Sequence, residues 1–173
     1  MEKKLKTPIS DFERVSLNIG DEVLISGIIY TARDAAHKNM VDALDESKEL
    51  PFDLKGQVVY YVGPTPAKPN QAIGSCGPTS SYRMDKFSPR LMKEGLKVMI
   101  GKGERSQELI NEVKKYQGVY LMAIGGIGAL LSKTVKSSEV IAYPELGAEA
   151  IRKLEVVNFP AIVAIDSKGN TLF

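Results

Sequence analysis

Short β-branched segments alternate along this chain with segments of helical spacing, and this alternation restricts what it can fold into. The expected strands are 21–30, 57–62, 96–100, 118–124, 139–143 and 161–165. The expected helices are 31–50, capped by Thr31, and 88–95, 106–116 and 146–154. β-Branched residues favour strands, whereas apolar residues three or four positions apart favour helices. The order of these elements predicts an α/β fold with a mixed sheet.

The composition indicates one globular domain over residues 1–173. Hydrophobic residues are 43% and charged residues 25%, which excludes a disordered chain. Because 23 Lys and Arg face 21 Asp and Glu, the net charge of +2 gives no general attraction for nucleic acid or an anionic membrane. Residues 1–10 do not read as a signal segment, and no apolar run approaches the roughly 20 residues that span a bilayer. We therefore expect a cytoplasmic protein whose anion site, if it has one, is local.

The single cysteine, Cys76, limits the metal chemistry of the chain. One thiol cannot form an internal disulfide, and it cannot by itself supply a cysteine-based zinc site or an iron–sulfur cluster. The sequence predicts that this chain alone binds no metal or cofactor.

The stretch Gly74–Asp85, GSCGPTSSYRMD, combines turn-forming residues with hydroxyls and an arginine. Thr79 or Ser80 is suited to cap a short helix, where free backbone N–H groups attract anions. Arg83, four residues after Thr79, would then share its helical face. A hydroxyl-rich cap is also common in purely structural positions, so local chemistry leaves both interpretations open.

Polar residues also follow two of the expected strands. Arg33, Asp34 and His37 come after the first strand, at a helix start where the dipole favours negative charge. Lys102 follows the strand 96–100 and lies between two glycines. The GxxxxGK[ST] spacing of a P-loop is absent, and the glycines at 125, 126 and 128 have the wrong spacing for a dinucleotide fingerprint.

Five motifs together carry a resemblance to a known family. They are TARDAAHK at 31–38, GPTSSYRMD at 77–85, GKGERS at 101–106, GGIGALL at 125–131 and FPAIVAIDSKGN at 159–170. In this order they resemble the β subunit, or C-terminal domain, of the iron–sulfur-dependent class I fumarate hydratases and L-tartrate dehydratases. The resemblance implies the swivelling β/β/α fold, a compact mixed sheet with flanking helices.

The family reaction adds or removes water across the C2–C3 bond of a small dicarboxylate, and the resemblance implies roles for four residues. Arg33, Arg83 and Lys102 match the positions that bind the substrate carboxylates. Thr79 matches the proposed base at C3. A threonine hydroxyl is a poor base at neutral pH, so positioning the substrate is the alternative role.

The resemblance also implies a partner. In the family, a [4Fe–4S] cluster with one open iron site acts as a Lewis acid on the leaving hydroxyl. Since Cys76 alone cannot hold it, a separate α subunit would carry the cluster, in an expected α2β2 assembly. A buried, inert thiol is the preferred interpretation of Cys76.

Several neighbouring residues are assigned supporting or surface roles. Asp34 and Asp85 are expected to orient the arginines, and His37 to be structural or to contact a carboxylate. Arg105 and Lys38 are interpreted as solvated surface charges, but Arg105 belongs to the GKGERS motif, and helping to close the site is its alternative role. Residues 125–126, 145 and 149 are candidate interface positions.

Fumarate is the favoured substrate because GERS and GGIGALL look more like the fumarase branch. The bulky Tyr82 beside Arg83 leaves specificity open, with an L-tartrate dehydratase β subunit as the alternative. A third possibility is an anion-binding or docking module without activity of its own.

Overall fold

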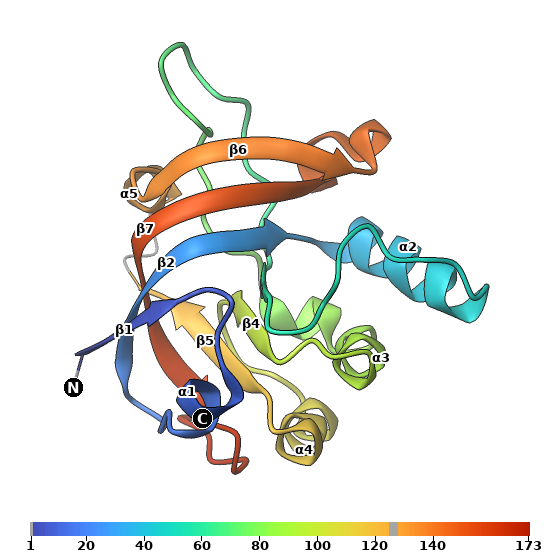
Figure 1. The fold of residues 1–173 in the computed structure, drawn as a ribbon, viewed down its shortest axis with the longest axis vertical. Helices are drawn as coiled ribbons and strands as arrows, with labels where there is room; N and C mark the ends of the chain where they lie inside the picture. Colours follow the sequence, from blue (N-terminus) through green and yellow to red (C-terminus); the bar gives the residue numbers. More distant parts are fainter. Residues whose placement is uncertain (1, 125–127) are drawn as a thin grey trace.

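A mixed seven-stranded sheet organises the part of the chain that the computed structural model describes, residues 2–124 and 128–173 (Figure 1). The strand order is β1-β2-β3-β4-β5-β7-β6. The strands are β1 (Glu2–Lys6), β2 (Glu22–Thr31), β3 (Val58–Tyr60), β4 (Val98–Gly101), β5 (Val119–Ala123), β6 (Val135–Ala142) and β7 (Ile151–Ile165). The predicted mixed sheet is thus confirmed.

The long strand β7 closes this sheet into a barrel. Its residue Ala161 pairs antiparallel with Val23 of β2 and with Ala123 of β5. Between those two strands, β2, β3, β4 and β5 run parallel to one another. Because parallel strands end on the same side, the carboxyl ends of all four lie along one rim of the barrel.

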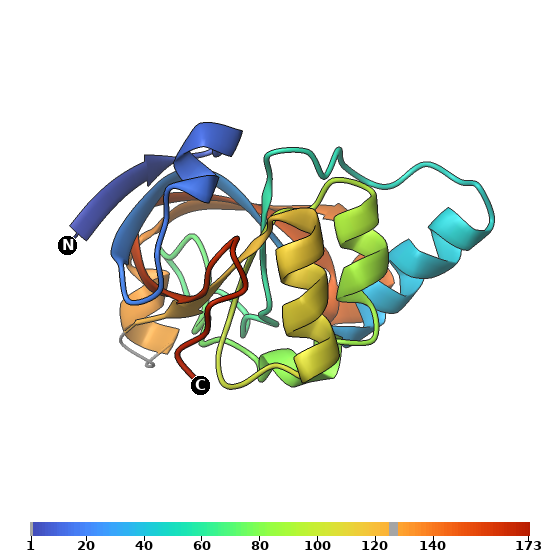
Figure 2. The same cartoon turned by 90° about the horizontal axis from the view of Figure 1, so that it is seen from below.

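Helices flank the sheet, as predicted (Figure 2). The α-helices are α1 (Asp11–Val15), α2 (Asp34–Asp45), α3 (Ser88–Lys93), α4 (Gln107–Tyr116) and α5 (Gly128–Ser132), and the 3₁₀ helices are η1 (Ser81–Met84) and η2 (Pro144–Glu149). Helices α2, α3 and α4 lie in a row in Figure 2. Ser106 caps α4 by accepting a hydrogen bond from the Leu109 N–H, and α3 ends before Gly95, which has φ +117°.

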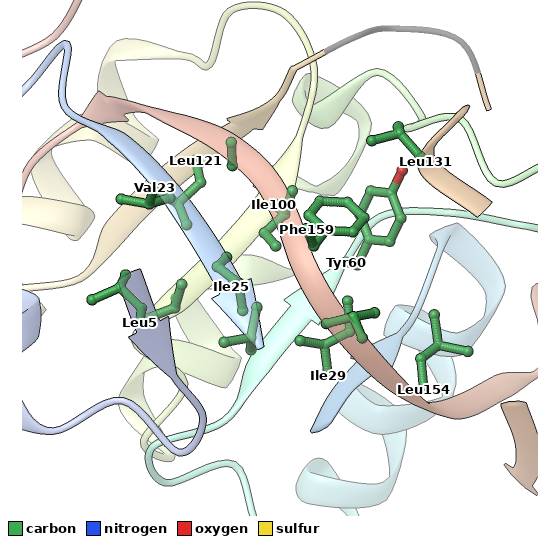
Figure 3. Close-up of a cluster of buried hydrophobic side chains, with 14 of the residues drawn as sticks. Leu5, Val23, Ile25, Ile29, Tyr60, Ile100, Leu121, Leu131, Leu154 and Phe159 are labelled. Carbon is green, nitrogen blue, oxygen red and sulfur yellow. The ribbon is translucent and has the colours of Figure 1, made fainter. Parts of the chain in front are cut away.

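Alternating side chains of the strands build two hydrophobic cores. In β3, Val58 and Tyr60 belong to the cluster that fills the barrel, where the Tyr60 and Phe159 rings meet edge to face at 5.1 Å (Figure 3). Val59 and Tyr61 belong to the second cluster, which α2, α3 and α4 complete. This period of two explains the near-continuous apolar sequence of the strand, because both of its faces are buried.

The predicted helix over 146–154 is wrong. Residues 144–149 form η2, and the strand β7 begins at Ile151. Gly147 has φ +62° and ψ −121°, which no helix accommodates. Beyond Gly147, the side chains of Ile151, Leu154 and Val156 are buried. Of the charged residues between them, Lys153 and Glu155 are exposed. Sheet pairing on both sides of β7 overrides the helical spacing of Leu146 and Leu154.

The start of α2 differs from the prediction. Thr31 does not cap α2, because it is the last residue of β2, and its buried hydroxyl accepts a hydrogen bond from the Arg152 N–H at 3.0 Å. Arg33 occupies the N-cap position without a side-chain cap. The strand β1 and the helix α1 are not evident from the sequence, because their many polar residues hide the hydrophobic pattern. No helix in the described ranges is both long and apolar enough to cross a bilayer.

Candidate functional site

The strand-end rim brings together residues that are far apart in sequence. Arg33 follows β2, and Lys102 follows β4. The segment 79–81 pairs with the ends of β3 and β4, because the Thr79 N–H donates to the Tyr61 carbonyl at 2.7 Å and the Ser81 N–H donates to the Lys102 carbonyl at 2.9 Å. The rim therefore holds three of the segments singled out in the sequence.

Asp34 links the two arginines of this rim. Arg83 Nε donates to Asp34 Oδ2 at 3.0 Å, and Arg33 Nε lies 3.7 Å from Asp34 Oδ1. The exposed Lys102 has no ion-pair partner within 4.0 Å in the ranges that the structure describes. The rim thus carries three cationic side chains, and the carboxylate of Asp34 lies between two of them.

Gly63 explains how Arg33 reaches this position. A Cβ atom on Gly63 would lie 3.0 Å from Arg33 Cδ and 3.2 Å from the Ala148 carbonyl. The arginine side chain therefore lies across bare backbone just after β3, where a larger residue would displace it.

The predicted helical face shared by Thr79 and Arg83 is wrong. The helix is the four-residue 3₁₀ turn η1, with Ser80 at its N-cap and no side-chain cap bond. Thr79 lies before the helix, half-buried and fixed by its backbone bond to Tyr61. Backbone pairing with the strand ends, rather than a helical face, positions Thr79.

His37 is a buried structural residue of α2. Its Nδ1 lies 2.8 Å from the Arg33 carbonyl, and its ring packs against Tyr61 at 5.3 Å. Since a carbonyl only accepts, Nδ1 carries the proton of the neutral ring. Burial lowers the pKa of His37 to about 4, although the bond to Arg33 opposes this. The ring holds the backbone of Arg33 and does not carry charge near neutral pH.

The pKa of His37 predicts that acid destabilises the fold. The unfolded chain takes up this proton near pH 6.5 and the folded chain only near pH 4, so stability is complete above pH 6.5 and falls as the pH drops towards 4. Between pH 7 and pH 5 this group should cost about 2 kcal/mol of unfolding free energy.

Urea unfolding at both pH values would measure this cost, with His37→Asn as the control because an amide cannot titrate there. We expect the pH dependence of the variant to be smaller by the same amount. An equal dependence in both proteins would contradict the assignment.

Arg105 is not a solvated surface charge, contrary to the sequence interpretation. Its side chain is 0% exposed, and Nε donates to Asp85 Oδ1 at 2.5 Å. Asp85 therefore orients Arg105 and not Arg83, which pairs with Asp34 instead. The charged residues in GKGERS gave no sign of burial. The only available signal was the membership of Arg105 in a family motif.

A cavity of about 750 Å³ opens beside these residues, between η1 and the start of α4. It is lined by Asp34, Tyr82, Arg83, Asp85, Lys86, Glu104, Arg105 and Ser106. Tyr82 is 65% exposed at its edge. Arg33, Thr79 and Lys102 are not among the lining residues, so the cavity adjoins the rim and shares only Arg83 and Asp34 with its charged set.

Cys76 does not fit the role of a cluster ligand. The thiol is buried, burial raises its pKa to about 11, and Sγ donates to the Gly128 carbonyl at 3.8 Å. No group of three His, Cys, Asp or Glu side chains that could hold a metal occurs within residues 2–124 and 128–173. The residues that the structure describes thus provide no cradle for an iron–sulfur cluster.

Of the candidate interface positions, Glu149 contacts another element of the chain, and the two glycines cannot be described. Glu149 accepts a hydrogen bond from the Ala35 N–H at 3.2 Å, in the first turn of α2. The glycines at 125 and 126 lie outside the described residues.

The chain is thus an α/β protein whose barrel carries cationic side chains at the ends of its parallel strands. The Fumarase C-terminus family matches residues 2–173, and the chain belongs to this family. It is 40% identical over 157 residues to the aerobic class I fumarate hydratase of Escherichia coli (strain K12), covering 90% of this chain and 29% of that protein.

Two other relatives extend the comparison. Fumarate hydratase 2 of Leishmania major is 38% identical over 174 residues, covering 98% of this chain and 30% of the relative. A putative L(+)-tartrate dehydratase subunit beta of Methanocaldococcus jannaschii is 41% identical over 163 residues, covering 91% of this chain and 84% of the relative. The chain thus spans less than a third of the fumarate hydratases named here but most of the separate beta subunit.

Proposed function

We propose that this chain is the β subunit of a class I hydro-lyase that catalyses the reversible hydration of fumarate to malate. The observation that carries the proposal is the rim itself, where Asp34 joins Arg33 and Arg83 and Lys102 lies exposed nearby. Arginine and lysine are the side chains that bind carboxylates, so this set of cations is suited to a four-carbon dicarboxylate. The family and the fumarate hydratases among its relatives support the same reaction.

In this proposal the chain binds and orients the substrate. The two arginines and Lys102 bind the carboxylates, and Thr79 faces C3. In the dehydration direction the hydroxyl on C2 takes a proton from a general acid, which we assign to the α subunit, and leaves as water, and a base removes a proton from C3. Thr79 either accepts that proton or fixes the carbon for another group, because its hydroxyl would need strong cationic stabilisation to act as a base.

The proposal requires a partner. Cys76 is unsuited to bind a cluster, so we assign the [4Fe–4S] cluster to a separate α subunit, in a cytoplasmic α2β2 assembly with a shared site. The beta subunit among the relatives, which this chain covers to 84%, supports a separately encoded β chain.

Reconstitution with the α subunit tests this function. The chain alone should show no turnover, and the complex should interconvert fumarate and malate, followed through the absorbance of the fumarate double bond. Preferential turnover of L-tartrate would select the tartrate dehydratase alternative, which the M. jannaschii relative favours. No turnover of any hydroxy-diacid with an active, cluster-loaded partner would contradict the enzyme and favour a docking module.

A further inference from the structure

Arg105 lies where two walls of the rim are joined. One wall is the segment 79–85, which carries Thr79 and Arg83. The other is the loop 101–106, which carries Lys102. Asp85 lies at the end of the first wall, and both of its carboxylate oxygens accept hydrogen bonds from the second wall. Oδ1 accepts from Arg105 Nε at 2.5 Å, and Oδ2 accepts from the Ser106 N–H at 2.6 Å.

Two buried tyrosines hold the guanidinium of Arg105 in place. Its Cζ atom lies 5.2 Å from the Tyr61 ring centre and 4.8 Å from that of Tyr120, which places the cation within reach of both rings. Nη2 donates to the Tyr61 hydroxyl and to Ser88 Oγ, each at 3.2 Å. Tyr61 follows β3 and Tyr120 lies in β5, so one side chain connects the loop after β4 to both neighbouring strands.

The tyrosines extend the connection to the rest of the rim. The Tyr61 carbonyl accepts from the Thr79 N–H. The Tyr120 hydroxyl lies 2.7 Å from Ser81 Oγ and 2.8 Å from the Gly103 carbonyl, so it also lies between the two walls. Every contact of this network touches a residue within a few positions of Thr79, Arg83 or Lys102.

We propose that Arg105 is a positioning residue, which sets the spacing between Arg83 and Lys102 and thereby makes the site selective for a diacid over a monoacid. The inference rests on the proposed function, because it takes Arg83 and Lys102 as the cations that bind the two carboxylates. A monoacid needs only one cation and does not depend on their spacing. Arginine is required because its guanidinium donates to Asp85 from one nitrogen and to Tyr61 and Ser88 from another, whereas the single ammonium nitrogen of a lysine cannot contact all three.

The test is Arg105→Lys in the complex with the α subunit. Inhibition constants would be measured for succinate, a saturated four-carbon diacid, and for butyrate, the matching monoacid. We expect the succinate constant to rise about tenfold. With the spacing changed, succinate can no longer keep the forked, charge-assisted contact with Arg83 while its other carboxylate binds Lys102. The butyrate constant should change less than about twofold, since it does not use the spacing.

Two further variants keep the test decisive. Asp85→Asn should give the same selective loss, and the double variant should lose little more than either single one, because the two residues act as one unit. If Arg105→Lys does not assemble, Asp85→Asn decides. Arg90→Lys is the matched control: Arg90 is a half-buried residue of α3 that pairs with Glu94 at 2.6 Å, and its replacement should leave both constants unchanged.

The outcomes separate this inference from the function on which it rests. A selective loss of succinate binding supports it. Equal changes for succinate and butyrate, or none, in a wild-type complex that turns over fumarate would overturn the positioning role alone. A wild-type complex without turnover would overturn the proposed function and the inference with it.

Discussion

Replacing Arg83 by alanine is expected to lower turnover of the complex by roughly 100- to 1,000-fold, the loss usual for one well-placed charge-stabilising donor. The guanidinium is exposed at the rim and fixed by Asp34 at 3.0 Å, so its removal takes away a forked carboxylate contact without opening a core. Subunit association should remain intact, because Arg83 serves the substrate in this proposal.

Steady-state kinetics and size-exclusion chromatography of the complex would check both halves of this prediction. Arg90→Ala is the control, since Arg90 has the same chemistry but pairs with Glu94 on α3, and its turnover should stay near that of the wild type. Turnover that survives in Arg83→Ala would show that the rim arginine does not bind substrate. Loss of association would reassign it to the interface.

Replacing Gly101 by alanine is expected to cost about 3 kcal/mol of unfolding free energy, at the upper end for overpacking a buried position. An added Cβ would lie 1.9 Å from Ser81 Oγ and 2.8 Å from Tyr61 Cδ2. Neither neighbour can yield easily, because Ser81 is bonded to Lys102 and Tyr61 packs in the second core. Urea unfolding would measure the loss.

Gly103→Ala separates this steric effect from the general cost of losing a glycine. Gly103 has φ +80°, but among the described residues no heavy atom lies within 4 Å of an added Cβ, so only backbone strain of about 1 kcal/mol is expected. Ser81→Ala combined with Gly101→Ala should recover part of the larger loss, since it removes the closest atom. Equal destabilisation by both single substitutions would contradict the tight contact.

The sequence predicted the fold where local pattern and tertiary structure agree. The strand at 58–60, the cap at Ser106 and the end of α3 near Gly95 follow from residue preferences that act over a few positions. The helix expected at 146–154 failed because β7 is stabilised by strands far away in sequence, which no short window contains.

The candidate site shows the same division. Local chemistry and the family motifs selected Arg33, Thr79, Arg83 and Lys102, and the structure places their segments on one rim. The partners could not be predicted, because sequence adjacency favoured Asp85 for Arg83, whereas the fold pairs Arg83 with Asp34 and buries Arg105 against Asp85. Which carboxylate pairs with which arginine depends on how the strand ends align in the folded sheet.

Barrel closure by β7 also has a consequence for how the protein is made. The ribosome synthesises β2 near the beginning of the chain, yet β2 stays without its antiparallel neighbour until β7 emerges after every other strand. Until then the edges of β2 and β5 are open to pairing with other chains. Since such distant pairing is slow, the nascent chain is expected to depend on chaperones, or on early capture by the proposed α subunit, during this interval.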